Sequence, residues 1–334
     1  MVIVDSYFVA VILCFVTMLC WGSWANTQKL ASKEWRFQLF YWDYSIGVLL
    51  LALLLAFTAG SIGSGGRSFI ADLSQADFAM LWSAFLGGVV FNFANILLVA
   101  AIDIAGMAVA FPVGIGIALA QGVLVNYISK PEGNPVILFI GVALVVVAIV
   151  IDALAYKKMQ VKAQQGTAKG LILSVIAGIA MGFFYKFVAG SMAADFVNPA
   201  AGQLTPYTAV VVFSVGLLLS NIIFVTVIMK KPISGEPVAP GDYFRKGNTK
   251  LHLVGILGGA IWSLGMSLSI IASGAAGPAI SYGLGQGATM VAAFWGVFIW
   301  KEFKDAPKGT GKLIAAMFFF FIIGLSLIIA ARVM

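Results

Sequence analysis

The sequence predicts an all-α polytopic membrane protein with ten transmembrane helices, arranged as two inverted five-helix repeats. Apolar residues make up 61% of the 334 residues and charged residues 10%, and the mean hydropathy is +1.03. Ten apolar segments are each about 20 residues or longer, enough to cross about 30 Å of hydrocarbon. In addition, Leu86-Gly87-Gly88 recurs 171 residues later as Leu257-Gly258-Gly259, which indicates an internal duplication.

This composition excludes a soluble globular protein with one core. The net charge of +7 would suggest a nucleic-acid partner in a soluble protein. Here the charge lies in the loops and reports topology, so we expect the lipid bilayer as a partner and no nucleic acid. The first apolar segment lacks a preceding basic region and is followed by nine more, so we predict that it stays as a helix and is not a cleaved signal peptide.

The predicted helices are joined by short loops and by two longer ones, over residues 61–78 and 230–250, that we expect to be solvated connectors. The helices are predicted at residues 7–28, 38–60, 79–102, 106–128, 135–156, 170–192, 206–229, 251–273, 277–300 and 311–331. Paired glycines in the third and eighth of these helices are typical of close helix packing.

The basic residues divide unequally between the two sides of the predicted bundle. One side receives sixteen of the twenty lysines and arginines, while the other receives only Arg67, Lys130 and Arg332, and Lys186 lies inside a helix. The positive-inside rule places the populated side in the cytoplasm. We therefore expect a multi-pass protein of the cell (plasma or inner) membrane, with both termini outside.

Each copy of the duplication contains five spans, so the two copies are predicted to have opposite orientations. Residues 1–156 form the first repeat, residues 157–169 a cytoplasmic linker, and residues 170–334 the second repeat. Inverted repeats of this kind are typical of secondary transporters, which work by alternating access. The chain contains no GxxxxGK[ST] loop, so we expect an ion gradient to supply the energy rather than ATP.

Transport sites in such folds lie near the bilayer midplane, and two asparagines are predicted there. Asn92 and Asn95 are three residues apart on the third helix, which favours one shared face. Amides offer donors and acceptors to a polar solute without the larger penalty of a buried charge. The alternative is that both asparagines only bond a neighbouring helix.

The ninth helix carries a polar stripe formed by Tyr282, Gln286 and Thr289, which we predict to line the solute pathway. Its alternative role is helix packing. Trp24, in a stripe with Trp21 and Gln28, and Trp262 near the midplane offer flat aromatic faces for a sugar or a planar heterocycle. Tryptophans at a membrane interface are also simple anchors.

Asp43 is the candidate for a titrating or cation-binding coupling group, because a carboxylate inside a membrane span is costly unless it is hydrated, protonated or paired. Its alternative is an interfacial carboxylate bonded to a tyrosine or an inner-loop base. Lys186 lies too far from Asp43 for direct pairing. Its structural interpretation is that the side chain extends outward, toward Asp195. His252 is the only histidine and lies at the inner rim. We find no catalytic constellation, metal site or cofactor motif, so an enzyme is not expected.

Several motifs together resemble the drug/metabolite transporter superfamily, and within it the glucose/ribose porter and rhamnose symporter branch and the related plant ureide permeases. The motifs are Leu86-Gly-Gly, Asn95 eleven residues before Gly106, Ala110-Phe-Pro-Val-Gly-Ile-Gly116, Tyr41-x-Asp43-Tyr44 and Trp295-Gly296-x-x-x-Trp300-Lys301-Glu302. The resemblance implies energised uptake of a small polar compound through a cavity between the halves. The plant permeases carry a nucleotide-binding-like loop between the halves that this chain lacks, which favours a sugar.

We therefore expect a secondary active importer of a small polar solute, a sugar first, coupled to a proton or sodium gradient and acting as a monomer or homodimer. A ureide or nucleobase permease is the alternative. A further alternative from the same superfamily is an exporter of amino acids, nucleobases or drugs. No cofactor is expected other than the coupling ion.

Overall fold

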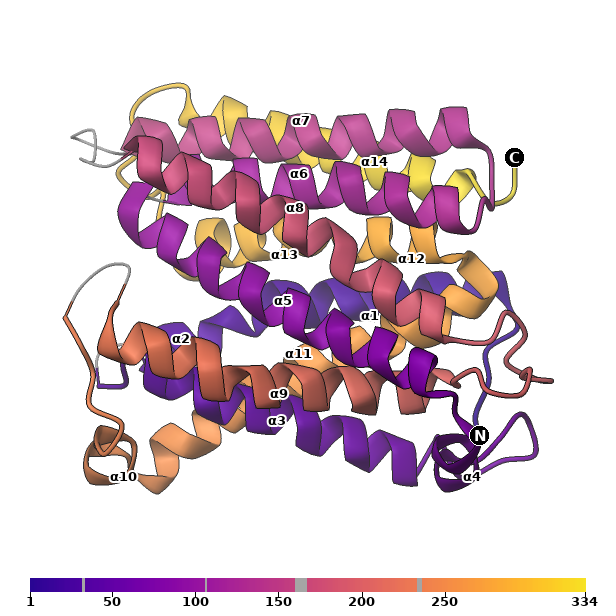
Figure 1. Ribbon diagram of the computed structural model, residues 1–334. Helices are drawn as coiled ribbons and strands as arrows, with labels where there is room; N and C mark the ends of the chain where they lie inside the picture. Colours follow the sequence, from indigo (N-terminus) through magenta and orange to yellow (C-terminus); the bar gives the residue numbers. More distant parts are fainter. Residues whose placement is uncertain (32–33, 106, 160–166, 233–235) are drawn as a thin grey trace.

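The computed structural model describes residues 1–31, 34–105, 107–159, 167–232 and 236–334, and the long helices in these ranges run side by side along one axis (Figure 1). Ten helical spans are long and apolar enough to cross a membrane, which confirms the predicted all-helical fold. Both termini lie at one end, here named the terminal end, and α10 lies at the opposite, lysine-rich end.

The spans follow the predicted order along the chain, with short additional helices in the loops. The helices are α1 (Tyr7–Ser23), α2 (Ala25–Ala31), α3 (Phe37–Phe57), α4 (Phe69–Gln75), α5 (Phe78–Ala105), α6 (Met107–Ser129), α7 (Pro135–Met159), α8 (Thr167–Ser191), α9 (Pro206–Lys230), α10 (Asp242–Lys246), α11 (Thr249–Ala276), α12 (Pro278–Gly285), α13 (Ala288–Phe294), the π-helix η1 (Trp295–Ile299) and α14 (Thr310–Ala330). The motif residue Gly106 and most of the predicted linker, residues 160–166, lie outside the described ranges.

The helices of the two halves interleave. In the first half α3 packs against α9 and α11, and α1 packs against α11, α12 and α13. In the second half α8 packs against α5 and α6, and α9 packs against α5. Near the edge of the bundle α7 contacts both α6 and α14, as Figure 1 also shows. Each half thus contributes helices to the centre of the molecule.

The closest of these helix contacts occur at glycines, as we predicted from the paired glycines of the sequence. A Cβ atom on Gly259 would meet the backbone carbonyl of Tyr44 on α3, and one on Gly88 would meet the carbonyl of Phe213 on α9. Only a residue without a side chain permits such backbone approach. The repeated Leu-Gly-Gly triplet therefore marks two equivalent helix contacts, α3 with α11 and α5 with α9.

Two spans that we predicted as continuous helices are interrupted. The first is interrupted at Trp24, between α1 and α2, and the ninth at Gln286 and Gly287, between α12 and α13. The backbone dihedrals there stay in the right-handed helical region, and three-residue turns replace part of the regular hydrogen-bond ladder. Gly285 and Gly287 flank the second break, and glycine costs about 1 kcal/mol relative to alanine inside a helix. A Cβ atom on Gly285 would lie 2.8 Å from the ring of Trp21, and one on Gly287 would lie 2.8 Å from the flexible end of Met18, both on α1.

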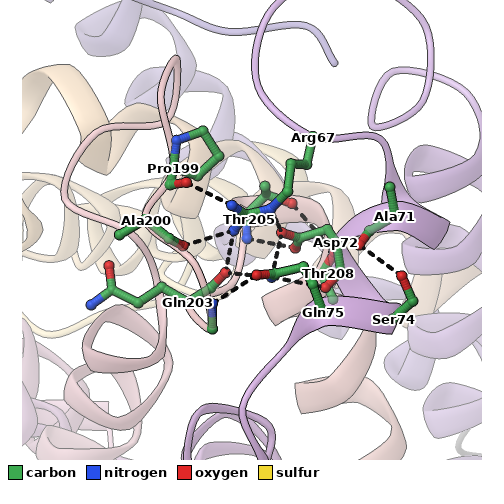
Figure 2. Close-up of polar contacts among 11 residues, drawn as sticks. Arg67, Ala71, Asp72, Ser74, Gln75, Pro199, Ala200, Gln203, Thr205 and Thr208 are labelled. Carbon is green, nitrogen blue, oxygen red and sulfur yellow. Dashed lines mark hydrogen bonds and ion pairs between the residues drawn. The ribbon is translucent and has the colours of Figure 1, made fainter.

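The terminal end is closed by loops that hold each other, and residues 61–78 are therefore not the solvated connector that we predicted. Arg67 pairs with the fully buried carboxylate of Asp72 at 2.8 Å (Figure 2). Asp72 in turn accepts a 2.7 Å hydrogen bond from the backbone N–H of Thr205. The Arg67 guanidinium also donates to the carbonyl oxygens of Pro199, Ala200 and Gln203. One arginine thus ties residues 67–75 to residues 199–205.

Candidate functional site

A cavity of about 330 Å³ lies at the centre of the bundle, within the range of small-molecule sites. Its walls come from both halves of the chain. The lining residues are Trp21, Gly22, Trp24, Ala25, Gln28, Phe91, Asn95, Leu98, Val99, Ile102, Ile115, Met181, Phe184, Trp262, Gln286, Ala288, Thr289 and Ala292. These described lining residues include no charged side chain. The cavity therefore suits a neutral solute better than an ion.

Five of the predicted site residues line this cavity together. Trp24 and Gln286 lie at the two helix interruptions, Asn95 on α5, Trp262 on α11 and Thr289 on α13. Interrupted helices leave backbone groups free of the regular ladder, and transporters place them at their solute sites. The sequence pattern thus located the cavity without showing that two helices break beside it.

Hydrogen bonds hold the Asn95 amide of the cavity and the backbone at Gln286. Asn95 donates from Nδ2 to the Tyr41 hydroxyl at 3.0 Å. Thr289 donates its hydroxyl proton to the backbone carbonyl of Gln286 at 3.0 Å, which fixes the turn between α12 and α13. Asn95 and Gln286 are 7% and 8% exposed, so any solute that reaches them is largely removed from water. Hydrogen bonds formed there discriminate strongly, because a buried polar group left unpaired is costly.

Aromatic rings form the wall of the cavity on its terminal side. The Trp262 ring centroid lies 4.4 Å from that of Phe91, and Phe91 packs edge-to-face on Phe184 at 5.1 Å. On its other side Trp262 stacks with Trp21 at 5.8 Å and an interplanar angle of 13°. Trp24 packs against Tyr44 at 4.8 Å. These rings leave flat apolar surfaces beside the amides.

Two predicted site residues do not line the cavity. Asn92 is fully buried and donates to Ser220 and Asn221 of α9 at 2.7 and 2.8 Å, so it bonds a neighbouring helix. Asn92 and Asn95 are only about 60° apart around the helix, since three residues advance about 300°, but this difference turns Asn92 toward α9 while Asn95 lines the cavity. Tyr282 is also fully buried, and its hydroxyl donates to the Ala118 carbonyl at 3.0 Å on α6.

Asp43 lies apart from the cavity, in a cluster at the lysine-rich end. Its Oδ2 accepts from the indole of Trp35 at 3.0 Å, and its Oδ1 lies 2.9 Å from Nδ1 of His252. The Tyr243 hydroxyl of α10 donates to the same Oδ1. Burial of Tyr243, followed by its hydrogen bond to Asp43 and the charge of that carboxylate, raises the pKa of the phenol above its usual value. This carboxylate is buried, paired and covered by the loop between α9 and α11.

Sequence reasoning missed three contributors to these sites. Phe91 and Phe184 form much of the cavity wall, but a phenylalanine in a membrane helix carries no signal that separates lining from packing. His252 contacts the candidate coupling residue, although it is distant from it in sequence. The alternative that we weighed for Asp43, a tyrosine or inner-loop base, describes the observed partners.

Ten candidate membrane spans around a central cavity whose described lining is uncharged define a multi-pass membrane protein with a cavity of small-molecule size. The profile of the ureide permease family matches residues 40–165 and 156–331. The chain therefore belongs to the ureide permease family. Because these proteins are transporters, it is not an enzyme.

Curated relatives extend over almost the whole chain. Ureide permease 2 of Arabidopsis thaliana is 25% identical over 396 residues, and ureide permease 1 of the same plant is 24% identical over 392, each covering 99% of both chains. Both alignments are longer than this chain, so these relatives hold inserted residues. The probable ureide permease A3 of Vigna unguiculata is 31% identical over 152 residues, or 44% of this chain and 40% of its own.

A solved crystal structure shares the fold. It superposes with a TM-score of 0.64 over 98% of this chain and 99% of its own, at 15% sequence identity. The likeness at this identity concerns the fold alone. The resemblance to ureide permeases is thus confirmed, while the wider superfamily and its sugar-porter branch stay expectations.

Proposed function

We propose that the protein carries a small neutral ureide, a solute built on the N–C(=O)–N group, across the membrane through the central cavity. The observation that carries the proposal is the pairing of two amide side chains, Asn95 and Gln286, with indole rings in a cavity whose described walls are uncharged. The similarity to ureide permeases 1 and 2 of Arabidopsis thaliana gives independent support. A sugar, which we expected from the sequence, has no such support.

The chemistry of the walls suits a ureide. A primary amide presents one carbonyl acceptor and two N–H donors, and a urea group presents the complementary pair of edges. Trp24 and Trp262 can then cover the flat face of the bound group, since aromatic rings stack in offset geometry at 4.5–7 Å. A sugar would use the same amides but has no planar face of this kind. The site therefore combines hydrogen bonding at the edge with stacking on the face.

We further propose that transport occurs by alternating access of two inverted five-helix repeats. The helix contacts support this proposal. Exchanging each span for the span five positions away along the chain converts the contact of α1 with α11 into the contact of α8 with α5. The same exchange converts the contact of α3 with α11 into the contact of α9 with α5. The lining residues Ala25 and Ala292, near the lysine-rich end, are exposed, while those in the middle are buried. This arrangement fits a state open toward the cytoplasm.

Coupling to a proton or sodium gradient, with import as its direction, belongs to the same proposal. Asp43 is the coupling candidate, and its support is the buried carboxylate in contact with His252 and Tyr243. A carboxylate so placed changes its partners when it binds a cation or a proton. The family assignment gives the class of solute, and coupling needs its own measurement.

Ligand-induced thermal stabilisation of the purified protein tests the solute. We would compare hydantoin, a cyclic ureide, with uracil, glucose, rhamnose and neutral amino acids, each at rising concentration. A ligand at 100 times its dissociation constant stabilises the folded state by about 2.7 kcal/mol. We expect stabilisation by hydantoin in the wild-type protein and a much smaller stabilisation in Asn95→Ala. Stabilisation by sugars alone would overturn the ureide proposal, as would an unchanged response of Asn95→Ala.

A further inference from the structure

A second cavity, of about 450 Å³, lies at the terminal end of the same bundle and is here named the outer vestibule. Its walls come from α5, α6, α8, α11, α12 and the loop after α8. The lining residues are Ser83, Asn126, Ser129, Lys130, Lys186, Phe187, Ala189, Gly190, Met192, Ala193, Ala194, Phe196, Gln203, Ser273, Gly274 and Pro278. Unlike the central cavity, it contains charged side chains.

The outer vestibule and the central cavity are lined by successive parts of the same helices. The same helices line both: α8 contributes Phe184 to the central cavity and Lys186 to the vestibule, and α11 contributes Trp262 and Ser273 in the same order. Between them lies a layer of buried tyrosines. The Tyr185 and Tyr282 rings are 5.2 Å apart, and both side chains are fully buried.

Hydrogen bonds of the tyrosine hydroxyls hold this layer in place. Tyr185 contacts Ser269 at 3.1 Å and donates to Ser281 at 3.3 Å. Gly122 of α6 leaves room for the Tyr282 ring, which a Cβ atom at that position would strike. Alternating access requires a solute route with two segments that are separated by a closed layer. The vestibule therefore occupies the position of the outer segment.

Lys186 is the feature of the vestibule that packing does not explain. It lies on α8 four residues, about 6 Å, before the end of its membrane span at Gly190, and the residue is exposed at that end of the bundle. Its ammonium makes no hydrogen bond or ion pair with any residue that the structure describes. The structural interpretation named Asp195 as partner, but that carboxylate accepts from the backbone of Val197 and Asn198 at 2.8 and 3.2 Å.

The second lysine of the vestibule differs in this respect. Lys130 pairs with Glu132 at 2.9 Å, and Glu132 also pairs with Arg332. Its charge is thus compensated, which leaves Lys186 as the uncompensated donor among the described lining residues. A donor with three N–H groups and no acceptor selects an oxygen acceptor. A carbonyl oxygen of the solute is such a group.

We infer that the outer vestibule is a second binding site for the ureide, in which Lys186 holds a carbonyl oxygen of the solute before it passes the Tyr185–Tyr282 layer. The inference rests on the proposed function for the class of solute. The roof of this site is the loop over residues 192–205, whose Gln203 carbonyl accepts from both Arg67 and Gln75 (Figure 2). The contacts between residues 67–75 and this loop therefore also fix the depth of the vestibule.

Protection of an introduced thiol tests this site directly. Gly190 lines the vestibule, and a Cβ atom there meets nothing within 4 Å, so Gly190→Cys fits without strain. We would modify it with a membrane-impermeant methanethiosulfonate added to intact cells, with and without hydantoin. Cys14 and Cys20 are buried, and the unsubstituted chain gives their background. We expect hydantoin to slow modification at least threefold, with protection kept in Lys186→Arg and lost in Lys186→Gln.

Matched variants separate this inference from the proposed function. Ser64→Cys, an exposed position in the loop before α4 at the terminal end that lines neither cavity, should be modified by the same reagent and show no protection. Lys169→Gln, at the other end of α8, should leave protection unchanged. Adding Asn95→Ala should abolish thermal stabilisation through the central cavity yet leave protection at Gly190→Cys. Protection that survives Lys186→Gln, or no protection at all, overturns the vestibule site, whatever the central cavity binds.

Discussion

The side-chain amide of Asn95 donates to the hydroxyl of Tyr41 at 3.0 Å, and this bond joins the cavity wall on α5 to a pair of stacked tyrosines on α3. The ring centroids of Tyr41 and Tyr44 are 5.1 Å apart, and both residues are fully buried. Tyr44, by contrast, has a hydroxyl without a hydrogen-bond partner among the residues that the structure describes. The two rings thus form a matched pair, of which one orients a site residue and the other only packs.

Replacing Tyr41 by phenylalanine should weaken solute binding. Tyr41→Phe removes the acceptor that orients the Asn95 amide, so we expect KM to rise about fivefold, near the 1 kcal/mol of one neutral hydrogen bond. Tyr44→Phe removes only an unpaired buried hydroxyl and should leave KM unchanged. Initial rates of hydantoin uptake into proteoliposomes would give both values. Equal KM values for the two variants would contradict the orienting role of Tyr41.

Asn92 and Asn95 should respond oppositely to substitution by alanine. Asn92→Ala leaves Asn221 without its 2.8 Å donor between α5 and α9, and a lost buried partner costs about 1–3 kcal/mol of folding stability. We expect a lower melting temperature with an unchanged KM. Asn95→Ala should keep its melting temperature without ligand and lose most of the hydantoin stabilisation. The reverse pattern would return Asn92 to the solute site.

Arg67→Lys should destabilise the protein because lysine cannot reproduce the guanidinium fork. Arg67 donates to three backbone carbonyls besides the buried Asp72 carboxylate, and losing most of these bonds should cost about 3 kcal/mol. Lys130→Gln breaks a more exposed pair and should cost less than about 1 kcal/mol. Thermal unfolding in detergent compares the two. Similar losses would show that the loop contact contributes no more than a surface pair.

Asp43→Asn should separate movement of the solute from its accumulation. The amide keeps an acceptor oxygen for Trp35 but cannot hold a negative charge for a coupling ion. We expect exchange of labelled hydantoin across proteoliposomes to continue, while uptake driven by an imposed proton or sodium gradient falls at least tenfold. Glu34→Gln, a nearby loop carboxylate, serves as the control. Gradient-driven accumulation at the wild-type level in Asp43→Asn would exclude this carboxylate from coupling.

The Tyr243 contact should stabilise the folded protein in a pH-dependent manner. Its raised pKa means that the folded state favours the protonated phenol, so the stabilisation is complete below the unfolded pKa of about 10 and is lost as pH rises through the higher folded value. Tyr243→Phe should therefore melt below the wild-type protein by a constant margin from pH 7 to 9. That margin should shrink above pH 10. A margin independent of pH would exclude this titration.

Much of the fold could be predicted because membrane spans depend on long apolar runs and on the distribution of lysine and arginine. The Leu-Gly-Gly triplets were informative for the same reason, since a glycine in a membrane helix usually marks backbone approach. The interruptions at Trp24 and Gln286 could not be predicted in this way. They depend on contacts between α1 and the Gly285–Gly287 turn, which are remote in sequence.

The site could be predicted in part. Asn95, Gln286 and Thr289 stand out because polar groups are rare in membrane helices, yet the same rarity selected Asn92, which bonds α9. Rotation about the helix axis separates the two asparagines, and only the packing of the neighbouring helices fixes that rotation. Asp43 illustrates the same limit, because its histidine and tyrosine partners come from a loop some 200 residues away.

The glycine contacts of the two halves have a mechanical consequence. Gly88 lies directly against the Phe213 carbonyl and Gly259 directly against the Tyr44 carbonyl. No glycine side chain separates the two backbones at either contact. We expect the pair α5 and α9, and the equivalent pair α3 and α11, each to move as a rigid unit. We then expect bending to occur in the spans interrupted at Trp24 and Gln286, both of which line the central cavity.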